Sequence, residues 1–168
     1  MKRLFITVTL SFLLITGTTV FSHDDASHKF RKIHHKYAPR VNWKSLEEGL
    51  SLSETLKKPL LVDFGVEEGC HRCAFMQKNI YGDDEILEKI NTDFLPVFID
   101  LSKPLSSREV ALGEKYDFKH DCLLLFLNHK GEVIHNPEGM EMCFAGKIEP
   151  EVFIDYLEYI IKMYNQNI

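Results

Sequence analysis

The stretch that decides the fold is Leu60–Cys73, which reads LLVDFGVEEGCHRC. Its first seven residues are apolar except for Asp63 and Gly65, a pattern typical of a short, buried central strand. Two cysteines in Cys-x-x-Cys spacing follow, and we expect a helix over His71–Tyr81. Cys70 would then lie at the start of this helix, where unpaired N–H groups and the helix dipole favour a thiolate. Cys73, one turn further on, can close a disulfide with Cys70.

This cysteine pair is compatible with three kinds of site: a redox centre, half of a zinc site, or a purely structural disulfide. His71 and Arg72 place positive charge or hydrogen-bond donors beside the sulfurs. Such surroundings lower the pKa of a cysteine from about 8.5 toward about 3.5–7.5. The chain has no second Cys-x-x-Cys or His-x-x-x-His at zinc-finger spacing, so we assign no metal ligands. The pattern favours a redox centre with Cys70 as the nucleophile and Cys73 as the resolving thiol.

The sequence on both sides of this stretch alternates between helical and strand-like patterns. Apolar spacing, capping residues and turn signals predict the following elements: a helix over Ser45–Leu56, a helix from Asp83 or Asp84 to Asn91, a strand over Leu95–Leu101, a helix from Ser106 or Ser107 to about Tyr116, a strand over Cys122–Leu127, a turn at Asn128–Gly131, strands over Glu132–His135 and Glu141–Ala145, and a helix over Glu151–Tyr164. Helix-linked strands followed by a hairpin and a last helix indicate an α/β domain with a mixed sheet.

Length and composition exclude several classes of protein. The chain has 168 residues, of which 45% are apolar and 27% charged, with four cysteines. These values exclude a multi-domain enzyme, wholesale disorder and a disulfide-dense scaffold. The net charge of −5 and the isoelectric point near 5.9 exclude a strongly basic nucleic-acid binder.

The N-terminus resembles a secretory signal. Lys2 and Arg3 precede an apolar run over Leu4–Ile15, and Val20 and Ser22 are small enough for a signal-peptidase site. We expect residues 1–22 to be a signal peptide cleaved after Ser22, residues 23–42 a polar arm containing histidines, and residues 43–168 the domain. An uncleaved membrane anchor is the alternative, which the threonines in this segment weaken. The arm is either simply solvated or binds a metal.

Taken in order, these pieces resemble the thioredoxin-fold proteins from Trp43 to about Ile161. The resemblance rests on the strand motif KPLLVDF at 58–64, the Cys-His-Arg-Cys motif at 70–73, the stretch YDFKHDCLLLFL at 116–127, and Gly146, Pro150 and Phe153. With an export signal, the chain is most similar to exported thiol:disulfide oxidoreductases of the Dsb type, such as the C-terminal domain of DsbD and the DsbH-type periplasmic reductases. The implied fold is thioredoxin-like, with a central mixed β-sheet flanked by helices.

The resemblance also implies an activity and a location. It implies dithiol–disulfide exchange in the periplasm, with protein disulfides as substrates, a DsbD-like membrane reductase as recycling partner, and no organic cofactor or nucleic acid. Whether the protein reduces or oxidises its substrates stays open. A stabilised thiolate favours the reduced form of the motif and raises its reduction potential, whereas the resemblance favours a reductase. Asp63 corresponds to the residue that exchanges a proton with the second cysteine. The alternative for Asp63 is that its carboxylate points to water at the edge of the strand and has no role in the reaction.

The sequence departs from the family pattern in three places. Gly69 stands where the family usually has tryptophan, and one extra residue separates Asp63 from Cys70. Cys122 takes the position of a cis-proline that, in the family, faces the two cysteines and docks substrate. We therefore expect Asp121 and Cys122 to bind substrate or tune the site, together with His71 and Arg72. We expect a trans Asp121–Cys122 bond, because non-proline cis bonds cost about 2.5–4 kcal/mol.

Cys122 leaves three roles open. It is a buried packing residue, a thiol that exchanges with the Cys-x-x-Cys pair, or a third metal ligand beside Cys70 and Cys73, completed by His120 or His71. The last role makes a metal-binding protein or metal chaperone the alternative function. Cys143 falls in a late strand and is expected to be structural, although a disulfide with Cys122 is possible.

Overall fold

A computed structural model describes residues 36–116, 123–144 and 146–166, and the following statements concern these residues. They all belong to one compact unit, Arg31–Ile168. The expected signal peptide lies outside them. In the described part of the chain, no helix combines the length and apolar character needed to cross a membrane.

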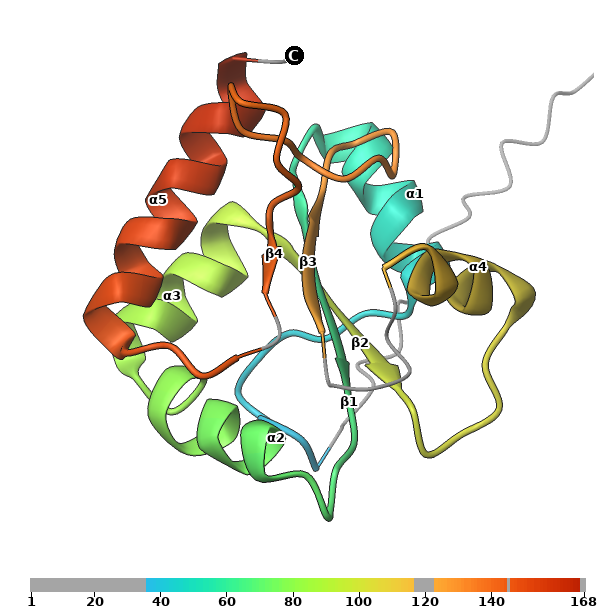
Figure 1. Ribbon diagram of the computed structural model, residues 1–168, viewed down its shortest axis with the longest axis vertical. Helices are drawn as coiled ribbons and strands as arrows, with labels where there is room; N and C mark the ends of the chain where they lie inside the picture. The colour runs from blue at the N-terminus through green and yellow to red at the C-terminus, as the bar shows by residue number, and fades with distance from the viewer. Residues whose placement is uncertain (1–35, 117–122, 145, 167–168) are drawn as a thin grey trace, which may run out of the picture. The chain divides into compact units, whose positions relative to one another are not determined.

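The centre of the domain is a four-stranded sheet in the order β2-β1-β3-β4 (Figure 1). Strand β1 (Leu60–Gly65) is parallel to β2 (Leu95–Asp100) and antiparallel to β3 (Leu124–Leu127), which in turn is antiparallel to β4 (Cys143–Phe144). The expected mixed sheet is therefore confirmed. Its two longest strands, β1 and β2, are buried along their whole length, as the apolar runs predicted.

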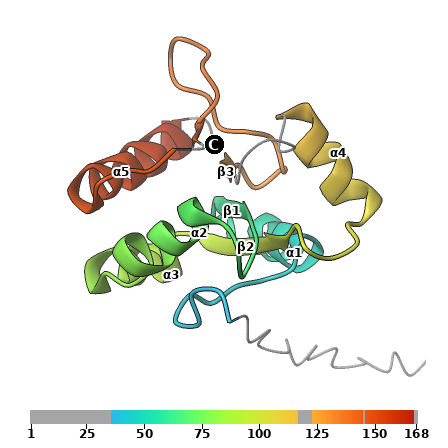
Figure 2. The same cartoon turned by 60° about the horizontal axis from the view of Figure 1, so that its bottom comes forward.

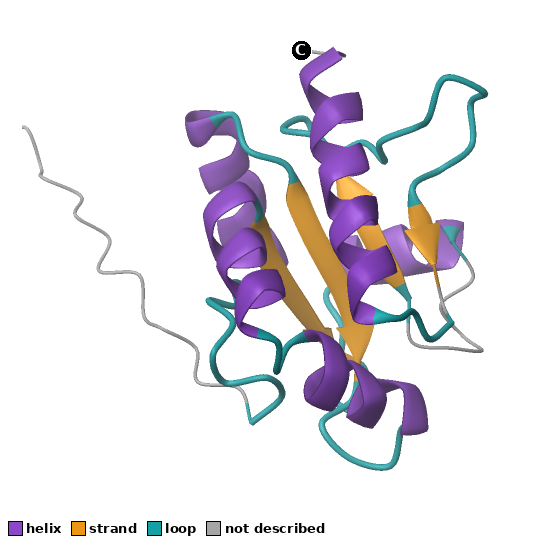
Figure 3. Ribbon diagram, turned by 90° about the vertical axis from the view of Figure 1, so that its left-hand side faces the viewer, coloured by secondary structure: helices purple, strands orange, loops and turns teal. Residues whose placement is uncertain are grey.

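Helices cover both faces of this sheet (Figures 2 and 3). Residues of α3 (Asp84–Asp93) and α5 (Pro150–Gln166) pack with Leu61 and Phe126 in one apolar cluster. Residues of α1 (Leu46–Leu56) and α4 (Ser107–Lys115) pack with Leu60, Val62 and Phe64 in a second cluster. The pleat of β1 sends alternate side chains to opposite faces, so Asp63 points to the same side as Leu61.

The local signals that start the helices act as expected. Ser45 caps α1 by accepting the amide of Glu48, and Asp83 caps α3 in the same way. Ser106 and Glu109 form a reciprocal capping box at the start of α4. These side chains satisfy amides that a helix leaves unpaired at its first turn, which is why the three helix starts could be predicted.

Two regions differ from the sequence expectation. The helix over His71–Tyr81 is α-helical only in α2 (His71–Phe75) and continues as the π-helix η1 (Met76–Ile80). The strands expected over Glu132–His135 and Glu141–Ala145 are reduced to the isolated bridges Leu127–Val133 and His135–Glu141 and to the short β4. A turn at Asn136–Gly139, in which Gly139 has φ +80°, connects His135 to Glu141.

The core extends into the segment that the sequence assigned to the polar arm. Tyr37, Ala38 and Val41 are buried in the same apolar cluster as α3 and α5. The indole nitrogen of Trp43 donates to the carbonyl oxygens of Tyr37 and Ala38, at 3.0 and 3.2 Å. Residues on the N-terminal side of Trp43 are therefore part of the folded unit.

Candidate active site

The two cysteines of the motif are joined by a disulfide at the start of α2. Their Cα atoms are 5.2 Å apart. Cys70 is the N-cap of the helix, and its sulfur accepts the backbone N–H of Cys73 at 3.0 Å. Cys70 is partly exposed, whereas Cys73 is 1% exposed. Cys70 therefore offers surface to an attacking molecule, whereas Cys73 is enclosed by the protein.

The sulfur of Cys73 lies against the end of β1. A Cβ atom at Gly65 would lie 3.6 Å from the sulfur of Cys73 and 3.1 Å from Cε2 of Phe98. The second distance is tighter than ordinary van der Waals contact. Cys73 thus packs close to β1, two residues along the strand from Asp63.

Asp63 lies inside the protein, with no exposed surface. Its Oδ2 accepts the hydroxyls of Tyr37 and Tyr81, at 2.9 and 2.6 Å, and its Oδ1 faces a guanidinium nitrogen of Arg72 at 3.4 Å. The alternative that Asp63 points to water is therefore wrong. Burial raises the pKa of Asp63, while the charge of Arg72 and the bonds from both hydroxyls act in the opposite direction.

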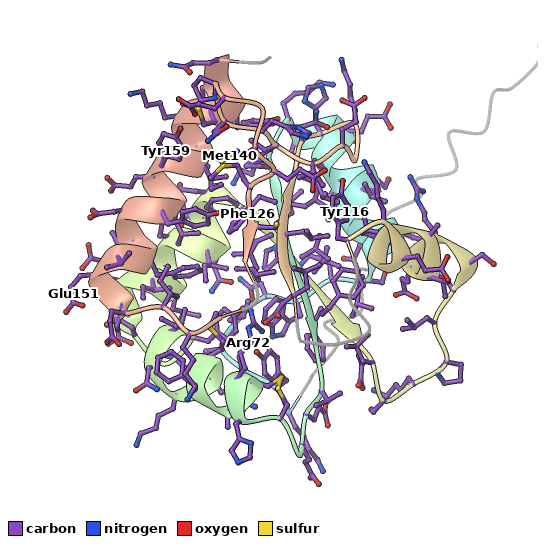
Figure 4. The ribbon with its side chains drawn as sticks, in the orientation of Figure 1. Arg72, Tyr116, Phe126, Met140, Glu151 and Tyr159 are labelled. Atoms are coloured by element: carbon purple, nitrogen blue, oxygen red, sulfur yellow. A yellow bond between two sulfur atoms is a disulfide. The ribbon has the colours of Figure 1, made fainter. Side chains whose placement is uncertain are left out.

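Arg72 points into the protein from the middle of the Cys-x-x-Cys motif, as Figure 4 shows. Its side chain is 9% exposed, and besides facing Asp63 it donates Nε–H to the carbonyl of Gly146 at 3.3 Å. The sequence suggested that its charge acts on the sulfurs. In the structure, it forms an ion pair with the buried carboxylate of Asp63. His71, the other residue between the cysteines, is exposed.

Sequence reasoning missed both tyrosines of this cluster. Tyr37 lies in the segment read as a polar arm, where it stacks on Phe98 at 4.5 Å between ring centroids. Tyr81 follows the π-helix and meets the ring of Trp43 edge-on at 5.4 Å. Burial, followed by the charge of Asp63, raises the pKa of Tyr81 well above its ordinary value, so its hydroxyl stays protonated and donates to Asp63.

Some expected site residues lie outside the described part of the chain. Asp121 and Cys122 are among them, and so is the expected trans bond between them. Cys143 is a free, partly exposed cysteine in β4, and burial followed by the charge of Glu141 raises the pKa of its thiol. Within the described residues, no group of three His, Cys, Asp or Glu side chains could hold a metal ion. The metal-binding alternative, which needs Cys122, stays a prediction.

Comparison with known proteins identifies the fold. A family model described as "Thioredox_DsbH: Protein of unknown function, DUF255" matches residues 24–105, just under half of the chain. No curated protein sequence matches the chain.

Solved structures match most of the chain. The structure titled "DsbH Oxidoreductase" aligns with a TM-score of 0.56 and 19% identity over 73% of this chain and 85% of its own. A thioredoxin from Thermus thermophilus gives 0.55 and 18% over 72% and 87%. The oxidised C-terminal domain of DsbD from Neisseria meningitidis gives 0.50 and 17% over 68% and 91%. This chain therefore has the thioredoxin fold, and the resemblance to DsbH-type and DsbD-type members of that fold is confirmed.

Proposed function

We propose that this protein is an exported thiol:disulfide oxidoreductase that reduces disulfides of other proteins through Cys70 and Cys73. The observation that carries the proposal is the disulfide at the start of α2, with a reachable Cys70 and a buried Cys73. A purely structural disulfide does not need one exposed and one buried cysteine. It also does not need a buried carboxylate such as Asp63 on the strand that it packs against. The family match and the structural neighbours support the same chemistry.

The reaction takes two steps. The Cys70 thiolate, stabilised by the N–H of Cys73, attacks a substrate disulfide and forms a mixed disulfide, and the first substrate thiolate leaves. Cys73 then attacks the Cys70 sulfur, which releases the second substrate thiolate and closes the Cys70–Cys73 disulfide. Two electrons pass to the substrate. Asp63 accepts the proton of Cys73 in the second step, a general-base role that suits a buried carboxylate whose pKa is raised.

Two parts of this proposal, that the protein reduces its substrates and that it acts in the periplasm, rest on the resemblance. A signal-like N-terminus and the likeness to DsbH and DsbD domains support export to the periplasm, with a DsbD-like membrane reductase as the source of electrons. The reduction potential tests the direction. A value near that of thioredoxin, about −270 mV, supports a reductase, and a value near about −120 mV would indicate an oxidase instead.

Cysteine variants test the activity. Mature protein is mixed with dithiothreitol and insulin, and the precipitation of reduced insulin chains is followed. Cys70→Ser is expected to abolish catalysis, and Cys143→Ser, the matched control, to react like the unaltered protein. When pre-reduced Cys73→Ser is mixed with insulin in the absence of dithiothreitol, it is expected to accumulate a mixed disulfide on Cys70. Full catalysis by Cys70→Ser, or bound metal in stoichiometric amount with no reversible two-electron couple, would overturn the proposal.

A further inference from the structure

The carboxylate of Asp63 is held by three donors from three separate parts of the chain. Tyr37 comes from the segment before α1, Arg72 from the Cys-x-x-Cys helix, and Tyr81 from the turn after η1. All four side chains are 9% exposed or less. Such a convergence of polar groups inside an apolar cluster carries a desolvation cost. The redox reaction offers a reason for it.

The donors are divided unequally between the two carboxylate oxygens. Oδ2 accepts hydrogen bonds from both tyrosine hydroxyls, whereas the one described partner of Oδ1 is the guanidinium of Arg72. A carboxylate offers about four lone-pair sites, two on each oxygen. Oδ2 is therefore saturated, and the remaining site for a proton is on Oδ1.

Among the described residues, the charged group that acts on this carboxylate is Arg72. The strands beside β1 place Phe98 and Leu124 opposite Asp63. The titratable groups that act on Asp63 are Arg72, Tyr37 and Tyr81. The cysteines of α2 supply the thiols, with Cys73 packed near Gly65 on the same strand. The proton balance of Asp63 thus depends on these few side chains.

We propose that Arg72, Tyr37 and Tyr81 are positioning residues for the proton transfer from Cys73, because they hold Asp63 as a carboxylate with Oδ1 open. This inference rests on the proposed function. When Cys73 attacks the mixed disulfide, the bond between Cys70 and the substrate sulfur breaks and the Cys70–Cys73 bond forms. The proton of Cys73 goes to Oδ1, and the substrate sulfur leaves as a thiolate. Arg72 keeps its charge throughout.

Loss of Arg72 has a defined effect on the second step. Its positive charge lowers the pKa of Asp63, because an opposite charge close by favours the charged form of a carboxyl group. In Arg72→Met the pKa of Asp63 therefore rises further. The pH at which the second step becomes fast is expected to rise by about one unit or more, so the step is about tenfold slower on the acid side.

The test follows the two steps separately at the site. Reduced protein is mixed with oxidised glutathione and quenched with acid at short times over a range of pH. Free thiols are then alkylated. Mass spectrometry of the peptide that contains Cys70 and Cys73 distinguishes dithiol, glutathione adduct and internal disulfide. The readout ignores Cys143 and every other cysteine outside that peptide. Arg72→Met, Arg72→Lys and Tyr81→Phe are compared with Lys78→Met, which removes an exposed charge from the adjoining helix η1.

The expected result is a shift confined to the second step. Arg72→Met shifts its pH profile upward, Tyr81→Phe shifts it less in the same direction, and Arg72→Lys restores part of it because the charge returns without the planar fork. Lys78→Met overlies the unaltered protein. An unshifted second step in Arg72→Met, or in Tyr81→Phe if Arg72→Met does not fold, overturns this inference alone. Failure of the unaltered protein to form the internal Cys70–Cys73 disulfide from oxidised glutathione would overturn the proposed function instead.

Discussion

The buried ion pair between Asp63 and Arg72 makes a prediction about stability that does not depend on catalysis. Its nitrogen and oxygen are 3.4 Å apart, with side chains 0% and 9% exposed. At an effective dielectric constant of about 20, the attraction across this distance is about 5 kcal/mol. Removing one partner of a buried pair typically costs about 3–5 kcal/mol. Arg72→Met is expected to lower the free energy of unfolding by about 3–5 kcal/mol at neutral pH.

Asp63→Asn is expected to behave differently from Arg72→Met. Because burial raises the pKa of Asp63 above 3.8, folding favours the uncharged side chain, and asparagine keeps an oxygen that accepts both tyrosine hydroxyls. Asp63→Asn should therefore cost less than Arg72→Met. In the Asp63→Asn background, Arg72→Met should also cost less than it does alone, by about 1–3 kcal/mol.

The pH dependence provides a second, independent check. A carboxyl group with a raised folded pKa contributes stability that is fully present below its unfolded pKa and is lost as the pH rises through its folded pKa. Arg72→Met raises the pKa of Asp63 further. Its stability deficit should thus be largest at neutral pH and should shrink on acidification, as Asp63 takes up a proton. Urea unfolding of the oxidised protein, followed by circular dichroism, measures both effects.

An exposed ion pair of the same chain is the matched control. Arg40 and Asp84 approach to 2.5 Å, but their side chains are 55% and 86% exposed. Their coupling energy should be at most about 1 kcal/mol in spite of the shorter distance, because water screens it. The reasoning is refuted if Arg72→Met costs the same in both backgrounds and at both pH values, or if the exposed pair couples as strongly as the buried one.

Three further predictions concern packing, capping and thiol reactivity. Gly49→Ala places a Cβ 2.5 Å from Cγ2 of Val97; overpacking of about 1–3 kcal/mol should outweigh about 1 kcal/mol of helix propensity, and Val97→Ala should reduce the loss, as urea unfolding will show. Ser106→Ala removes the capping side chain of α4 and should cost about 0.5–2 kcal/mol; an unchanged unfolding midpoint would contradict this. Glu141→Gln should speed alkylation of Cys143 at neutral pH, because the charge of Glu141 helps to raise the pKa of that thiol; equal iodoacetamide rates would disprove the effect.

Much of the fold could be predicted from the sequence because its signals are local. The apolar run at Leu60–Gly65 is buried on both faces of the sheet, and Ser45, Asp83 and Ser106 start helices as their side chains dictate. Capping and periodicity act within a few residues, so the printed sequence carries them in full. The Cys-x-x-Cys spacing likewise predicted the disulfide between Cys70 and Cys73.

The charge environment of the site was decided only by the tertiary structure. Asp63 meets Tyr37, Arg72 and Tyr81 across sequence separations of 26, 9 and 18 residues, and no local pattern relates these positions. Tyr81 follows a π-helix, where its N–H bonds to the carbonyl of Met76 five residues earlier. An α-helical reading cannot place the side chain after such a wide turn. The sequence by itself therefore determined which two cysteines form the disulfide. The packing of three distant segments decided which groups surround the buried carboxylate, because those contacts exist only once the sheet and its helices have assembled.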